Sequence, residues 1–220
     1  MTRTTNARVA GFTLLFYIAI GVTSLVLFGR ATGGEGIAAK LAGIAQHAPE
    51  VRLVVVLELL QCFSALVLGV TLWAITREQD PDLAMMGLAC RVGEGLIAAG
   101  SMPKTLGLLW LAAGTDAPAA GGAQALAAYL LRGNVALTAT FFAVGSALFA
   151  WLLLRGRRIP SPLAGLGLAA SVLLVVGLPL QLAGFFRGPA PALMWLPMLA
   201  FEVPLALWLL FKGVAEPTPR

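Results

Sequence analysis

The sequence predicts an all-α fold, an integral membrane bundle of six transmembrane helices with a short interfacial helix after span one. Of the 220 residues, 59% are hydrophobic and 11% are charged, whereas soluble domains carry about 25% charged residues. Mean hydropathy is +0.90. Several uninterrupted apolar runs reach the roughly 20 residues that a helix needs to cross a hydrocarbon layer about 30 Å thick. We therefore expect residues 1–220 to form a single transmembrane helical domain.

The apolar runs place the six spans at 9–29, 53–75, 83–102, 134–154, 162–186 and 192–212. The first run is longer than the core of a signal peptide, which has about 7–15 residues, so we expect it to remain attached as the first span. Six spans put both termini on one side. With an internal N-terminus, eight basic residues lie outside the spans or at a span end on the cytoplasmic side, and six lie on the external side. This excess, to which the "RGRR" turn at 155–158 contributes most, predicts cytoplasmic termini.

Two outer connections are long enough to contain short helices. In "GIAAKLAGIAQHAPE", apolar residues recur at helical spacing from Ile37 to Ile44, as in a helix that lies in the headgroup region, and Pro49 is expected to end this helix. In the other connection, Pro103 cannot donate to the carbonyl of Ala99, so the third helix should kink there and continue outward, or bend along the interface. A loop over "TDAPAAGG" and a short helix over "AQALAAYLLRG" then lead into span four.

Charged residues within the spans indicate a functional site. Arg91 and Glu94 lie one turn apart on the same face of span three, Glu202 lies near the middle of span six, and Glu58 lies nearer the outer end of span two. A charged group at mid-bilayer costs at least ~2.5–3.5 kcal/mol on insertion scales, so such groups face the bundle interior and are usually paired. We expect an inward-facing ion pair between Arg91 and Glu94, with Glu202 as its third member.

One arginine against Glu94 and Glu202 leaves an excess acid. Because two nearby carboxyls cannot both ionise cheaply, one of them is expected to hold a proton at neutral pH. Such a group can be a general acid, a proton carrier or a hydrogen-bond donor to a ligand. The pair of Arg91 with one glutamate can equally be a structural lock between helices, because removing either member leaves a buried charge without compensation. The residues leave both interpretations open.

Polar and small residues on other spans indicate where a pocket would form. Glu58 and Gln61 begin a stripe on span two, and Asn134 and Thr138 begin one on span four. We interpret Arg91 as the fixed charge of an acidic intramembrane pocket, with Glu58 and Gln61 at its outer mouth. The predicted ligand-binding residues are Arg91, Glu94, Glu202, Glu58, Gln61 and Asn134, and the candidates for catalysis are Glu202, Glu94 and Glu58.

The sequence lacks the motifs of several catalytic classes. It has no G-x-S-x-G, no H-E-x-x-H, no Walker loop and no aspartate-rich magnesium site, since Asp80 and Asp82 in "REQDPD" are expected to cap a turn. A single histidine, His47, does not provide a zinc site, and neither Cys62 nor Cys90 has a histidine as a base. We expect no metal and no cofactor. The basic residues are scattered around the spans, so nucleic acid is not an expected partner despite the net charge of +5.

Three stretches resemble a known family. "CRVGEGLIAAG" in span three, "RIPSPLAGLGL" entering span five and "FEVPLALWLLFKG" closing span six are similar, in this order, to bacterial multi-pass membrane proteins filed as "domain of unknown function 4386". The resemblance implies about six helices in a bacterial membrane and no established activity. The family's arginine and glutamate in span three fall on Arg91 and Glu94, and its "F-E" in span six falls on Phe201 and Glu202. The family often has a histidine near the start of span four, where this chain reads "LRGNVALTATFF".

Three functions are compatible with the sequence. The leading hypothesis is a plasma-membrane protein, surrounded by membrane lipid, that binds or transports a small or amphiphilic ligand in the acidic pocket. A chain this short suits transport best as a homodimer, in which a second copy completes the pathway. The alternative is a membrane-embedded acid–base enzyme of isomerase or cyclase type that acts on a lipid or terpenoid, with a protonated Glu202 or Glu58 as the acid. The third is an accessory subunit whose charge cluster is purely structural.

Overall fold

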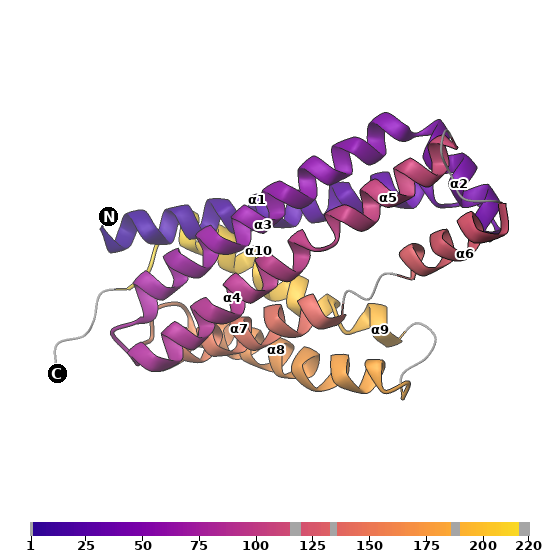
Figure 1. The fold of residues 1–220 in the computed structure, drawn as a ribbon. Helices are drawn as coiled ribbons and strands as arrows, with labels where there is room; N and C mark the ends of the chain where they lie inside the picture. The colour runs from indigo at the N-terminus through magenta and orange to yellow at the C-terminus, as the bar shows by residue number, and fades with distance from the viewer. Residues whose placement is uncertain (1, 115–119, 133–135, 186–189, 216–220) are drawn as a thin grey trace. The chain divides into compact units, whose positions relative to one another are not determined.

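The computed structural model describes residues 2–114, 120–132, 136–185 and 190–215, and every regular element in these ranges is a helix, as the sequence predicts (Figure 1). Among these residues, five stretches are long and apolar enough to cross a membrane: Arg3–Ala31, Ala48–Thr76, Pro81–Ala113, Gly121–Arg155 and Ser161–Leu182. The next apolar helix, α10 (Leu196–Phe211), has 16 residues, fewer than the roughly 20 that a straight crossing needs. The protein is therefore an all-α membrane protein, and the sixth span stays a prediction.

The chain divides into two compact units, of which the first comprises Met1–Tyr17, Phe63–Gly95 and Ala136–Arg220. Its helices are the first part of α1 (Arg3–Ala31), the last part of α3 (Ala48–Thr76), most of α4 (Pro81–Ala99), α7 (Ala136–Arg155), α8 (Ser161–Leu182), α9 (Ala190–Leu193) and α10. Helix α8 packs against both α7 and α10, and α7 and α8 lie side by side (Figure 1).

Glycines bring helix backbones of the first unit into contact. A Cβ at Gly11 of α1 would lie 2.5 Å from the carbonyl oxygen of Ala206 in α10, and a Cβ at Gly167 of α8 would overlap the ring of Phe201. Small residues let membrane helices approach closely, because lipid gives helices no hydrophobic reason to associate. Helix α10 is thus fixed against α1 and α8, and this packing holds Glu202 in the interior of the unit.

The second unit comprises Ile18–Cys62 and Leu96–Val135. It contains the remaining parts of α1, α3 and α4 with α2 (Gly36–Gln46), α5 (Met102–Ala113) and α6 (Ala120–Leu131), and α2 packs against α5 and α6. Its buried core consists of Ala31, Ile44, Val51, Leu108, Leu111, Ala123 and Ala127. The short helix expected after span one is therefore present as α2, with Ile44 buried and Ile37 partly buried against this core. Its location in the headgroup region stays a prediction.

Proline positions explain where helix boundaries differ from those expected. Helix α2 ends at Gln46, three residues before the Pro49 that is expected to stop it, and Pro49 itself lies in the first turn of α3. A proline is well accommodated there, since the first N–H groups of a helix have no partner within it. Helix α3 consequently begins five residues before the expected start of span two.

The same rule applies at Pro103 and Pro197. The kink expected at Pro103 is a break, because α4 ends at Ala99 and α5 begins at Met102 with Pro103 in its first turn. The span expected at 192–212 is divided between α9 and α10, and Pro197 lies in the first turn of α10. The span expected at 162–186 ends earlier, at Leu182 of α8.

Candidate functional site

An ion pair between Arg91 and Glu94 lies in the interior of the first unit. Nη1 of Arg91 donates to Oε2 of Glu94 at 2.9 Å, and only 3% and 1% of the two side chains are exposed. The inward-facing pair that the sequence predicts is therefore present. Because the two charges are in contact, neither is left alone in an apolar interior.

Two further helices fix the members of this pair. Tyr17 of α1 donates its hydroxyl to Oε1 of Glu94 at 2.6 Å, and Nη2 of Arg91 donates to Oγ of Ser146 in α7 at 3.0 Å. The guanidinium carbon of Arg91 lies 4.8 Å from the ring centre of Phe142, which is within the range of a cation–π interaction. Both oxygens of Glu94 thus accept a hydrogen bond, and Arg91 is fixed by side chains of α4 and α7.

Glu202 of α10 is the second acid of the site, and 8% of its surface is exposed. It interacts electrostatically with both Arg91 and Glu94. Among the residues that the structure describes, its carboxyl makes no hydrogen bond, and the buried Nε of Arg91 also has no partner there. We call Tyr17, Arg91, Glu94, Ser146 and Glu202 the buried charge cluster. It combines one guanidinium and two carboxyl groups, with a donor and an acceptor still unused.

Glycines allow the neighbouring helices to approach Arg91 closely. A Cβ at Gly69 of α3 would lie 2.9 Å from the Cβ of Arg91, and a Cβ at Gly145 of α7 would lie 3.1 Å from the Cβ of Cys90. Larger residues at these positions would push α4 away from α3 or α7. The position of the guanidinium is therefore set by packing on two sides as well as by its hydrogen bonds.

The other predicted site residues lie elsewhere in the chain. Glu58 and Gln61 are partly buried residues of α3 that belong to the second unit. There the hydroxyl of Thr105 in α5 donates to the carboxylate of Glu58, with oxygen–oxygen distances of 3.3 and 3.4 Å. Asn134 lies outside the described residues. Of the predicted set, the structure therefore brings Arg91, Glu94 and Glu202 together within one unit.

Three residues at the site were not predicted from the sequence. Tyr17 and Ser146 belong to the buried charge cluster, and Phe142 contacts Arg91. Tyr17 does carry a signal, since a buried tyrosine hydroxyl usually finds a partner and the chain has only two tyrosines. A serine in a membrane helix carries none, because its hydroxyl often bonds to its own helix, as Ser171 does to the carbonyl of Gly167 at 2.7 Å. Only the assembled helices distinguish Ser146 from Ser171.

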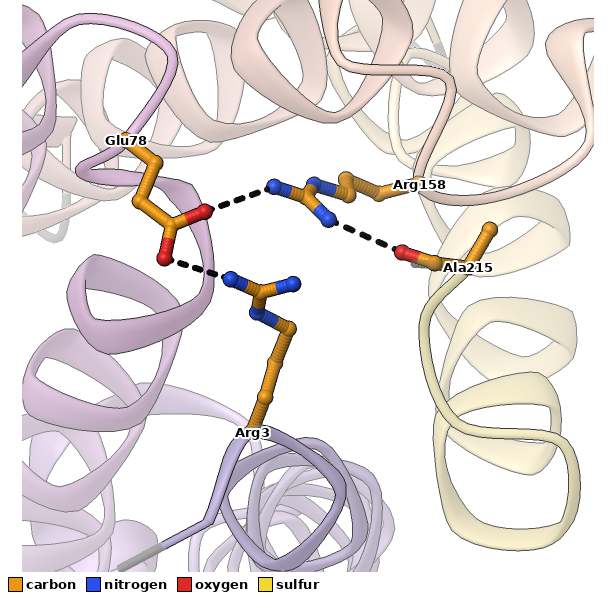
Figure 2. A network of polar contacts seen from close by, with 4 residues as sticks. All are labelled: Arg3, Glu78, Arg158 and Ala215. Atoms are coloured by element: carbon orange, nitrogen blue, oxygen red, sulfur yellow. Dashed lines mark hydrogen bonds and ion pairs between the residues drawn. The ribbon is translucent and has the colours of Figure 1, made fainter. Parts of the chain in front are cut away.

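A second polar network joins the ends of the helices in the first unit (Figure 2). Glu78, in the turn between α3 and α4, forms ion pairs with Arg3 of α1 and with Arg158, whose Nη2 lies 3.1 Å from Oε2 of Glu78. Nη1 of Arg158 also donates to the carbonyl of Ala215 at 2.9 Å, and the Ala215 N–H donates back to the Arg158 carbonyl at 3.0 Å. The hydrogen bond from Arg3, aided by the charges of Arg3 and Arg158, holds the pKa of Glu78 below its ordinary value.

The "RGRR" arginines therefore do more than mark topology. The side chain of Arg158 is fully buried, while Arg155 forms an ion pair of 3.5 Å with Asp80. Asp80 also caps α4, because its Oδ1 accepts a hydrogen bond from the Leu83 N–H at 3.1 Å. The capping role that the sequence predicts for Asp80 is confirmed.

A comparison with models of protein families agrees with the motifs in the sequence. Comparisons with curated proteins and with solved structures gave no match. A family model matches residues 9–213, and its description reads "Domain of unknown function (DUF4386)". This match covers the whole of the buried charge cluster and nearly the whole chain. The protein therefore belongs to the DUF4386 family of unknown function.

Proposed function

We propose that the protein binds a small or amphiphilic cation at the buried charge cluster in exchange for a proton on Glu202, and that it carries this ligand across the membrane. The observation that carries the proposal is the unequal bonding of the two acids. Glu94 accepts hydrogen bonds from Tyr17 and Arg91, whereas Glu202 makes none among the described residues. The carboxylate of Glu94 therefore already has hydrogen-bond partners within the protein, whereas the carboxyl group of Glu202 is available to bind a ligand.

The charges of the cluster favour an exchange of one cation for another. Arg91 and Glu94 compensate each other at 2.9 Å, so the state of Glu202 sets the net charge of the cluster. An ionised Glu202 leaves one net negative charge in an apolar interior, which is costly unless a cation accompanies it. A proton and a cationic ligand both supply this compensation. Binding of one therefore disfavours binding of the other.

A purely structural cluster would explain Arg91 and Glu94 but not Glu202. The bonds from Tyr17 and Ser146 are sufficient to lock α1 and α7 onto α4. A buried carboxyl without a hydrogen bond adds little to such a lock, and an apolar residue of similar size would pack at lower cost. The presence of an acid at position 202 therefore supports a role in binding.

Proton release on ligand binding tests the proposal directly. Purified protein in weakly buffered detergent is titrated with tetraphenylphosphonium, a lipophilic cation, while a pH indicator records released protons. We expect release that saturates with binding in the unmodified protein and is abolished by Glu202→Gln, which keeps the shape of the side chain but cannot ionise. Glu35→Gln, which removes the exposed carboxyl before α2, is the matched control and should release protons normally.

Transport is tested separately in proteoliposomes. With an imposed pH gradient, the unmodified protein should move ethidium, a fluorescent cation, and the Glu202→Gln variant should not. Proton release that is unchanged in Glu202→Gln would contradict the role of this residue. Cation binding with proton release but without ethidium movement would restrict the function to binding.

A further inference from the structure

A hollow of about 420 Å³ lies in the first unit, where α7 ends, α8 begins and α10 ends. Arg157, Arg158, Ser161, Trp208 and Lys212 contribute to its lining, and no acidic side chain among the described residues does so. Ligand pockets in proteins span about 300–1,000 Å³. The hollow is therefore large enough for a small polar group, and all the charged side chains among its described lining residues are basic.

Two of the three basic side chains that line the hollow are available to bind an anion. Arg158 is held by Glu78 and Ala215 (Figure 2). Arg157 and Lys212 are exposed, and neither forms an ion pair within the described part of the chain. Cations over a concave surface concentrate anions, and the planar guanidinium of arginine matches the oxygens of a phosphate.

The backbone of Arg157 is strained. Its φ is 49°, and among the described residues it is the non-glycine residue with a positive φ. Glycine adopts this conformation without strain, whereas another residue in this conformation lowers the stability of the protein. Such a residue is typically retained where its side chain is needed. The arginine at this position therefore indicates a role for its side chain rather than for its backbone.

The hollow also lies where three apolar helices of the first unit begin or end. Arg155 closes α7, Ser161 opens α8 and Phe211 closes α10, so this end of the first unit belongs near the boundary between membrane and water. Trp208, which is partly exposed, is of the residue type enriched at that boundary. The first N–H groups of α8 point out of the helix beside the hollow and carry no side-chain cap.

We infer that this hollow binds the phosphate headgroup of an anionic membrane lipid. Arg157 and Lys212 bind the phosphate oxygens, the Ser161 hydroxyl donates to them, and the Trp208 ring lies against the glycerol and acyl part of the lipid. The site is distinct from the buried charge cluster, because none of the cluster residues lines it. It does not depend on the exchange proposed at Glu202.

The test is a binding titration of delipidated protein in detergent, read by native mass spectrometry. The probes are dioleoylphosphatidylglycerol, which is anionic, dioleoylphosphatidylcholine, which is zwitterionic, and soluble glycerol phosphate as a competitor. We expect saturable binding of phosphatidylglycerol that is much tighter than that of phosphatidylcholine. The Arg157→Gly variant should bind phosphatidylglycerol about fivefold more weakly, as expected for the loss of one basic residue at an anionic headgroup.

Two variants separate the site from folding and from general charge. Arg157→Gly relieves the positive φ, so without lipid its melting temperature should equal or exceed that of the unmodified protein. Arg155→Gln removes the same charge two residues away, but Arg155 does not line the hollow, so this variant should bind phosphatidylglycerol normally. Equal weakening in both variants, or equal binding of the two lipids, would overturn the site. Competition by glycerol phosphate as strong as that by lipid would overturn the assignment to a lipid and leave a phosphate site.

Discussion

The hydroxyl of Tyr17 lies 2.6 Å from Oε1 of Glu94, and this hydrogen bond joins α1 to α4 inside the first unit. It also completes the bonding of Glu94, whose other oxygen accepts from Arg91. A hydroxyl that donates to a carboxylate forms a charge-assisted bond, which is stronger than a bond between neutral groups. The pairing of these two residues therefore connects the position of α1 to the state of the charge cluster.

Replacing Tyr17 by phenylalanine should destabilise the protein by about 1.5–3 kcal/mol, the usual contribution of a hydrogen bond to a charged group. The ring still packs in the variant, so only the bond to Glu94 is lost. Thermal unfolding in detergent, followed by circular dichroism, measures the effect. Tyr129→Phe is the control, because 72% of Tyr129 is exposed and its loss of a hydroxyl should leave the melting temperature unchanged. Equal melting temperatures for the two variants would contradict the assigned bond.

Replacing Arg91 by methionine should cost about 3–5 kcal/mol, because it leaves Glu94 as a buried charge without its cation. The Arg91→Met and Glu94→Gln double variant should recover much of this loss, since it removes both charges of the pair. A double-mutant cycle on the free energy of unfolding measures the difference. Strictly additive effects of the two single substitutions would show that the residues do not interact.

Two glycines of α1 should respond in opposite ways to substitution by alanine. At Gly11 a Cβ would lie 2.5 Å from the carbonyl oxygen of Ala206, whereas at Gly29 it would meet nothing within 4 Å. Gly11→Ala should therefore destabilise the protein by about 1–3 kcal/mol through overpacking. Gly29→Ala should be neutral or stabilise α1 by up to about 1 kcal/mol. Melting temperatures of the two variants check the prediction, and a loss at Gly29 as large as that at Gly11 would refute the packing argument.

The network at Glu78 should make stability depend on pH in the acidic range. Because bonding to Arg3 and Arg158 holds the pKa of Glu78 below its ordinary value of 4.5 in the folded state, the unfolded chain takes up a proton first as the pH falls. The stabilisation is therefore complete above pH 4.5 and is lost as the pH decreases through the pKa of the folded state. Glu78→Gln should lower the melting temperature at pH 7 and much less at pH 3. A constant difference between the two proteins at both pH values would contradict the prediction.

Local sequence patterns were sufficient to predict the all-helical membrane class and the central ion pair. Runs of apolar residues gave the membrane class, and the spacing of Arg91 and Glu94 placed the two charges on one helix face. The break between α4 and α5 differs from the kink expected at Pro103, because a proline is as compatible with the first turn of a new helix as with a bend. Propensity alone does not distinguish these cases.

Contacts between distant residues could not be predicted in this way. Glu78 lies 75 residues from Arg3 and 80 from Arg158, and nothing within "REQDPD" or "RGRR" indicates that these groups meet. The choice of Ser146 as a partner of Arg91 likewise depends on how α7 packs against α4 at Gly145. Partner choice follows from the order and rotation of helices, which a hydropathy pattern leaves open.

The division of the charges between α4 and α10 has a consequence for how the protein is made. Helix α4 carries both members of the Arg91 and Glu94 pair, so it can leave the translocon with its charges already neutralised. Helix α10 has no basic residue with which to neutralise Glu202, and an ionised group in lipid costs about 2.5–3.5 kcal/mol. Because α10 follows α1, α4 and α8 in the chain, the helices around this carboxyl are synthesised before it, and they can receive it as soon as α10 enters the membrane.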